Sequence, residues 1–200
     1  MHQYGIVDYR VNPEDEFSFY ALASQLELQC KSRAQIGWVG SFIFIGWAIG
    51  CIFIPPYADK NGRKGVFLMA LSIQFFTWIF ILNCPTIQVM YGLSFLFGVC
   101  IAGRYTVGYV FLVESMPKAY QVRIGLLVDV FETAILIWIT LYLSFVSKNW
   151  LGIQMFALTV NVLGLFLCFF LIKESPRYLL ETGRNEHAYI NLKFIAMRNG

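Results

Sequence analysis

The sequence contains few charged residues, and they form no acidic or basic tract. Charged residues make up 14% of the 200 residues and the formal net charge is +3, whereas soluble chains carry about 25% charged residues. These values argue against a soluble domain and against a nucleic-acid-binding protein. The five cysteines form no CxxC pair and the two histidines lie far apart, so no metal site is expected. No phosphate-binding loop or nucleophile elbow is present, and we expect neither a cofactor nor an enzyme.

The sequence is rich in apolar residues. The chain is 58% hydrophobic and 18% aromatic, with a mean hydropathy of +0.62. About 20 apolar residues are needed to cross a bilayer as a helix. Five stretches approach or exceed this length, and they are apolar on all sides rather than alternating, which excludes barrel strands. The sequence therefore predicts an all-α, polytopic membrane helix bundle in the lipid bilayer, with spans at 36–57, 65–82, 87–113, 124–146 and 150–172.

The Lys and Arg residues of the loops predict the orientation, because cytoplasmic loops are enriched in them. An extracellular segment at 1–35 places ten of these cations in the cytoplasm and four outside. Residues 173–200 then form a cytoplasmic tail, in which we expect short interfacial helices. A long segment outside the membrane with no helix before it also predicts that the chain is truncated at its front.

The short charged loop between the first two spans carries the first specific motif. Asp59, Gly62, Arg63 and Lys64 match the pattern G-x-x-x-D-x-x-G-R-K. In this position the sequence resembles the major facilitator superfamily, in which that loop joins the second and third helices. The chain departs from the pattern at its first glycine, where Pro55 stands.

Three further segments extend the resemblance. Glu114 followed by Arg123 is similar to the loop after the fourth helix in sugar and organic-ion porters, and the segment from Glu174 to Arg177 is similar to the one after the sixth. The turn that begins at Trp150 resembles the organic cation and anion branch. The resemblance implies that the five spans are helices two to six of twelve, a partial N-terminal half of the fold. The first helix and the C-terminal half are then the missing partners, and the plasma membrane is the expected location.

The resemblance also implies roles for the charged loops. In the family, acids and bases of these loops form a cytoplasmic network that holds the inner gate shut while the cavity opens outward. The alternative is that the cations only anchor the inner face. The matching gate positions are Asp59, Gly62, Arg63, Lys64, Glu114, Arg123, Glu174 and Arg177.

Three ionisable residues lie inside the predicted spans, where a charge costs at least about 2.5–3.5 kcal/mol. Arg104 and Glu132 fall at matching depth, roughly 13–15 Å from the inner ends of their helices. Asp129 lies about one turn from Glu132 on the same face. The surplus negative charge suits a cationic substrate or a proton carrier. The alternative is a buried structural pair of Arg104 with Glu132. The resemblance adds Tyr109 to the cavity lining.

These observations predict a transmembrane transporter of small organic solutes, most consistent with organic cations, that works by alternating access. A sugar/proton symporter-type carrier shares the same loops and is one alternative. A non-transporting membrane subunit, or a decayed fragment, is the other, because five spans cannot enclose a cavity between two bundles. An intramembrane enzyme would need a His, a paired Asp on a second helix or a metal set, which the sequence does not show.

Overall fold

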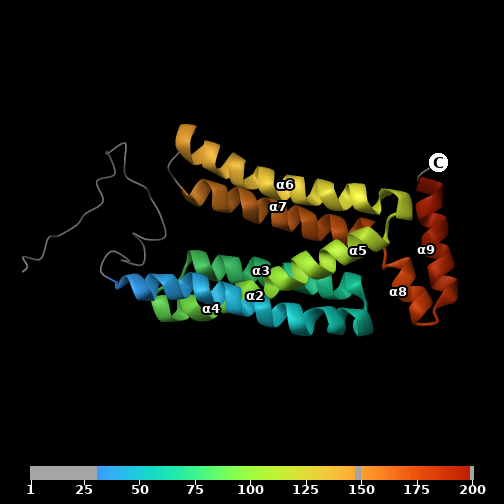
Figure 1. Ribbon diagram of the computed structural model, residues 1–200, viewed down its shortest axis with the longest axis horizontal. Helices are drawn as coiled ribbons and strands as arrows, with labels where there is room; N and C mark the ends of the chain where they lie inside the picture. The colour runs from blue at the N-terminus through green and yellow to red at the C-terminus, as the bar shows by residue number, and fades with distance from the viewer. Residues whose placement is uncertain (1–30, 147–149, 199–200) are drawn as a thin grey trace, which may run out of the picture.

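A computed structural model describes residues 31–146 and 150–198. All regular structure in these residues is helical, and five helices are long and apolar enough to cross a membrane. This confirms the predicted all-α polytopic membrane bundle. Figure 1 shows the five spans running along one common axis, with the two last helices beyond one end of the bundle. The segment 1–30 and the turn at 147–149 lie outside the described residues.

The first, second and fifth spans are single helices: α2 (Arg33–Asn61), α3 (Arg63–Leu82) and α7 (Trp150–Leu171). The third is continuous but not uniform, because α4 (Ile87–Ala102) passes through the π-helical η2 (Gly103–Val107) into α5 (Gly108–Glu114). The fourth is α6 (Lys118–Phe145). Most helices extend a few residues past the predicted apolar stretches, because polar residues at their ends continue the backbone hydrogen-bond pattern beyond the apolar core.

Helix α2 shows how local sequence sets these limits. Ser32 forms a capping box with Gln35: the Ser32 hydroxyl accepts from the Gln35 amide, and the Gln35 side chain accepts from the Ser32 amide. Pro55 and Pro56 both lie inside the helix, as membrane helices tolerate when neighbouring groups compensate for the lost hydrogen bonds. The helix continues to Asn61 and stops at Gly62, whose φ of 102° ends the helical conformation.

Helices α2 and α4 run in the same direction and pack through glycines. A Cβ atom added to Gly46 would collide with the carbonyl of Phe95, and one added to Gly98 would collide with the carbonyl of Ile43. The backbones therefore approach more closely than any side chain would allow, as small residues permit between membrane helices. This close approach fixes the lateral position of α4, and with it the position of α5.

Helix α3 is held against α4 and α7. The Trp78 ring meets Phe97 of α4 edge-on at 5.5 Å, and its indole N–H donates to Gln154 Oε1 of α7 at 2.8 Å. At the opposite end, the Lys64 ammonium donates to the Phe169 carbonyl at 3.1 Å. Buried polar groups in a membrane protein need such partners because lipid offers none.

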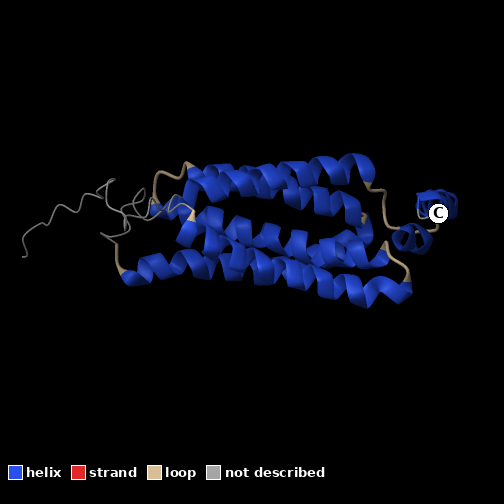
Figure 2. Cartoon of the chain, turned by 90° about the horizontal axis from the view of Figure 1, so that it is seen from above, coloured by secondary structure: helices blue, strands red, loops and turns tan. Residues whose placement is uncertain are grey.

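Two short helices lie across the end of the bundle (Figures 1 and 2). In α8 (Pro176–Glu181), Ser175 caps the N-terminus and proline occupies the first turn, where its missing N–H costs no helical hydrogen bond. Gly183, with φ of 74°, turns the chain into α9 (Asn185–Arg198). The side chains of Tyr178, Leu179 and Ala188 are buried together between the two helices. The pair is thus a packed unit rather than a loose tail.

The glycine packing generates a prediction with a matched control on the same helix. We expect Gly98→Ala to lower the free energy of unfolding by about 1–3 kcal/mol, because the added methyl group overpacks the α2–α4 contact. Gly92→Ala should be neutral or stabilising, since nothing lies within 4 Å of its added Cβ and alanine favours a helix by about 1 kcal/mol. Denaturation of the purified chain in detergent measures both. Equal effects of the two substitutions would contradict the close approach.

Candidate gate and polar face

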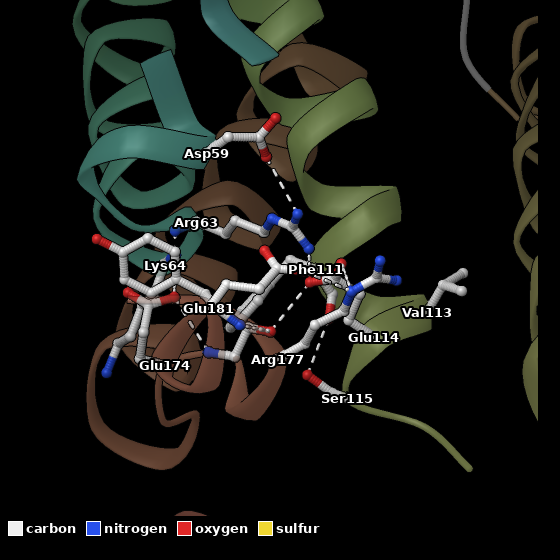
Figure 3. Close-up of polar contacts among 12 residues, drawn as sticks. Asp59, Arg63, Lys64, Phe111, Val113, Glu114, Ser115, Glu174, Arg177 and Glu181 are labelled. Carbon is white, nitrogen blue, oxygen red and sulfur yellow. Dashed lines mark hydrogen bonds and ion pairs between the residues drawn. The ribbon is translucent and has the colours of Figure 1, made fainter. Parts of the chain in front are cut away.

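A buried ion pair joins the start of α3 to the end of α5. The guanidinium of Arg63, through Nη1, contacts Oε2 of Glu114, and their side chains are only 10% and 8% exposed. Figure 3 shows Arg63 reaching across from α3 towards Glu114. A buried charge that loses its partner destabilises a fold by about 3–5 kcal/mol. This pair therefore links two spans that are 51 positions apart in the sequence.

Three more groups surround the pair. Asp59 Oδ1 accepts from Arg63 Nη2 at 3.0 Å, and the Ser175 hydroxyl donates to Glu114 Oε2 at 3.0 Å. Arg177 lies 3.7 Å from the second oxygen of Glu114. Asp59 and Arg177 are mostly exposed, and exposed ion pairs contribute about 0–1 kcal/mol each. The network thus has a buried centre and a weak, exchangeable rim.

Glu174 forms hydrogen bonds with backbone amides rather than an ion pair among the described residues. Its Oε1 accepts from the backbone amides of Arg63 and Lys64, at 3.1 and 3.0 Å, and from the Ser175 amide at 3.1 Å. The first amides of a helix have no partner inside it, and they attract negative charge. Glu174 therefore caps α3 from a distant part of the chain. Gly62 makes room for it, because a Cβ there would lie 2.8 Å from Glu174 Oε2.

The structure brings together most of the predicted gate residues at one end of the bundle. Arg123 is the exception: it lies on the exposed surface of α6, and no described contact joins it to the others. Lys64 takes part through its backbone amide and its link to α7. The residues that meet are Asp59, Gly62, Arg63, Lys64, Glu114, Glu174 and Arg177.

Two further residues belong to this network, and the sequence indicated no such role for them. The Ser175 hydroxyl accepts from the Tyr178 amide and so caps α8, and it also donates to Glu114. Glu181 binds Arg177 Nε at 3.0 Å, four residues along α8. The i, i+4 spacing of Arg177 and Glu181 is a signal that reveals the second contact. The contact between Ser175 and Glu114 depends on tertiary packing, and no local pattern predicts it.

A second group of polar residues lies deeper, between the third and fourth spans. The hydroxyl of Tyr109 on α5 packs against Gly125 of α6, where an added Cβ would lie 2.5 Å from it. Tyr105 of η2 interacts electrostatically with both Asp129 and Glu132. Because Gly125, Asp129 and Glu132 follow each other at i, i+4 and i+7, they occupy one face of α6. The two tyrosines, four residues apart, face that strip.

Arg104 does not join this polar face. Its side chain is exposed, and no ion pair connects it to Glu132 among the described residues. The alternative of a buried Arg104–Glu132 pair is therefore not what the structure shows. The sequence argument compared only the depths of the two residues, which does not determine the face of the helix on which each lies. Arg104 lies within η2, where a π turn holds more residues than an α turn. Tyr105 lies beside the acids in place of Arg104.

The chemistry of this face follows from its composition. Asp129 is exposed and Glu132 is half-buried in the described bundle, and two carboxylates on an otherwise apolar span can neutralise a cation or carry protons. Aromatic rings beside them can stack on an organic cation. Among the described residues, no group of three His, Cys, Asp or Glu is placed to hold a metal ion.

Comparison with known proteins places the chain in a family. Its residues 3–197 match the model of the family described as sugar (and other) transporter. It is similar to mouse solute carrier family 22 member 2, with 27% identity over 180 residues, which are 90% of this chain and 32% of that protein. It is also similar to a solute carrier family 22 member 15-like protein of Xenopus laevis, with 29% identity over 96% of this chain and 39% of that protein.

A rabbit protein, solute carrier family 22 member 1, gives a similar result at 26% identity over 183 residues. The chain spans 32% to 39% of the length of these curated relatives. Its five membrane helices, its loop motifs and the match of residues 3–197 to the family model agree with one another. The chain is a multi-pass membrane protein that belongs to the sugar (and other) transporter family of the major facilitator superfamily.

Proposed function

We propose that this chain forms part of a carrier that moves small organic cations across a membrane by alternating access. In this proposal the described spans are helices two to six of one six-helix bundle, and a first helix and a second bundle complete the carrier. The substrate site then lies near mid-membrane between the two bundles. The transporter family to which the chain belongs supports this mechanism.

The observation that carries the choice of substrate is the acid-bearing face of α6. Asp129 and Glu132 lie next to Tyr105, and Tyr109 packs one turn away over Gly125. No cation of the chain is paired with either acid among the described residues. Uncompensated carboxylates inside a membrane span are costly unless they meet a counter-charge. An organic cation supplies that charge, and the tyrosine rings supply its apolar contact.

The network around Arg63 and Glu114 acts as the gate in this mechanism. Its buried centre holds the ends of α3 and α5 together, while the exposed contacts of Asp59 and Arg177 can exchange partners at little cost. A rigid centre with a weak rim suits a contact that forms in one state and opens in another. Closing this end while the opposite end is open gives the alternation.

The orientation and the location are part of the proposal. The cations of the loops place the gate, α8 and α9 on the cytoplasmic side and the N-terminal segment outside. The plasma membrane is the location that we propose. A sugar carrier coupled to protons is the second candidate: the family description names sugars, and an exposed carboxylate such as Asp129 can bind a proton during the cycle.

Neutralising Asp129 tests the substrate proposal. In the carrier that contains this chain, we expect Asp129→Asn to reduce uptake of tetraethylammonium at least tenfold, because it removes one of the two charges that attract the cation. Surface expression, measured by biotinylation, should stay within about twofold, since Asp129 is exposed in the bundle. A tenfold loss corresponds to about 1.4 kcal/mol of transition-state stabilisation.

The matched control is Glu186→Gln, which removes one negative charge from the exposed start of α9, away from the polar face. Its tetraethylammonium uptake should equal that of the unmodified carrier. Retained uptake in Asp129→Asn contradicts the cation site. Uptake of glucose that depends on an inward proton gradient and fails in Asp129→Asn would instead favour the sugar carrier.

The gate pair is tested by a double-mutant cycle. Arg63→Gln and Glu114→Gln should each lower the free energy of unfolding by about 3 kcal/mol, because each leaves one buried charge unpaired. The double variant should lose clearly less than the sum of the two. Asp59→Asn should change the free energy of unfolding by less than about 1 kcal/mol, because the Asp59 side chain is 61% exposed. Additive losses, measured by denaturation in detergent, would show that the two residues do not act as a pair.

A further inference from the structure

A polar cavity lies at the end of the bundle that carries α8 and α9, beside the contacts of the Arg63–Glu114 network, with which it shares Glu174. Its volume is about 460 Å³, which falls within the range of about 300–1,000 Å³ of small-ligand sites. The end of α2, the connection before α8, and both end helices contribute to its walls. The lining residues are Lys60, Asn61, Glu174, Tyr178, Leu179, Arg184, His187 and Asn191.

The charge of this cavity is positive. Lys60 and Arg184 line it together with the imidazole of His187, and Glu174 is the one acid among the lining residues. The charge of Glu174 is already engaged, because its Oε1 accepts three backbone amides at the start of α3 and before α8. Among the described residues, no ion pair neutralises Lys60 or Arg184. The cavity thus presents to a ligand two cations that form no ion pair with any described residue.

The walls are fixed before any ligand arrives. The Tyr178 hydroxyl donates to the Lys60 carbonyl at 3.1 Å, which ties α8 to the end of α2. The Asn191 amide donates to the Glu174 carbonyl at 3.1 Å, which ties α9 to the residue before α8. Tyr178 is only 6% exposed and packs with Leu179 and Ala188. A preformed cationic cavity loses little entropy on binding an anion.

The surroundings indicate a membrane source for the ligand. Leu180 of α8 and Tyr189, Ile190 and Met197 of α9 are all more than half exposed, on helices that lie across the end of five membrane spans. Exposed apolar side chains on helices at such a level dip into the headgroup region of a bilayer. Basic pockets at that level bind phosphorylated lipid headgroups. We propose that this cavity binds the phosphomonoester headgroup of an anionic membrane lipid.

Binding of a short-chain lipid to the purified 200-residue chain in detergent tests the proposal. Dioctanoyl phosphatidylinositol 4-phosphate should bind saturably by microscale thermophoresis, and dioctanoyl phosphatidylcholine should not compete. The Lys60→Gln/Arg184→Gln variant should bind it about 30-fold more weakly, from about 1 kcal/mol for each basic residue near a charged headgroup. Both side chains are exposed, so the variant should keep the melting temperature of the unmodified chain.

The matched control is Arg33→Gln/Lys193→Gln, which removes the same charge from exposed positions that do not line the cavity. It should retain the affinity of the unmodified chain. Equal weakening by the two double variants, or equal binding of phosphatidylinositol 4-phosphate and phosphatidylcholine, overturns the proposal. Glycerophosphoinositol 4-phosphate, which lacks acyl chains, distinguishes the source. Weaker binding of glycerophosphoinositol 4-phosphate than of the lipid supports a membrane lipid as the ligand. Equal affinities would overturn the proposal of a lipid ligand and indicate a soluble phosphate ester instead.

Discussion

The contact between Arg63 and Glu114 is the constraint on which the polar network at one end of this bundle depends. It is buried, it joins spans distant in sequence, and the removal of either partner leaves an unpaired charge. The other polar contacts at that end are arranged around it: Asp59 holds the guanidinium, and Ser175 and Arg177 hold the carboxylate. A buried pair is not in itself a strong source of stability, but it specifies which helix ends meet.

The long apolar stretches were sufficient to predict the helices, and the loop motifs indicated most of the residues that meet in the polar network at one end of the bundle. Gly62 and Arg63 follow from the motif because a sharp reversal between two spans leaves few residue choices. The distant acid Glu114 was identified because its loop also fits the family pattern. Arg123 fits the same pattern but lies apart from the network, since a motif gives the neighbourhood of a residue and not the direction of its side chain.

Other features could not be predicted from sequence because they depend on packing. The residue count placed Arg104 and Glu132 at matching depth, whereas in the structure Tyr105, within the π turn, is the residue that interacts with the acids. No local preference in the sequence marks the position of a π turn. The second contact of Ser175 likewise exists only because α8 folds back beneath α5.

The links along α3 have a mechanical consequence. Near one end Trp78 binds Gln154 of α7, and near the other Lys64 binds the carbonyl of Phe169, while Glu174 holds the first amides of α3. Hydrogen bonds near both ends of α3 and α7 oppose rotation of one helix relative to the other. Helices α3 and α7 therefore move as one rigid pair. Bending within this part of the molecule is then easier where the regular hydrogen-bond pattern is interrupted, at Pro55 and Pro56 of α2 and at the π turn of the third span.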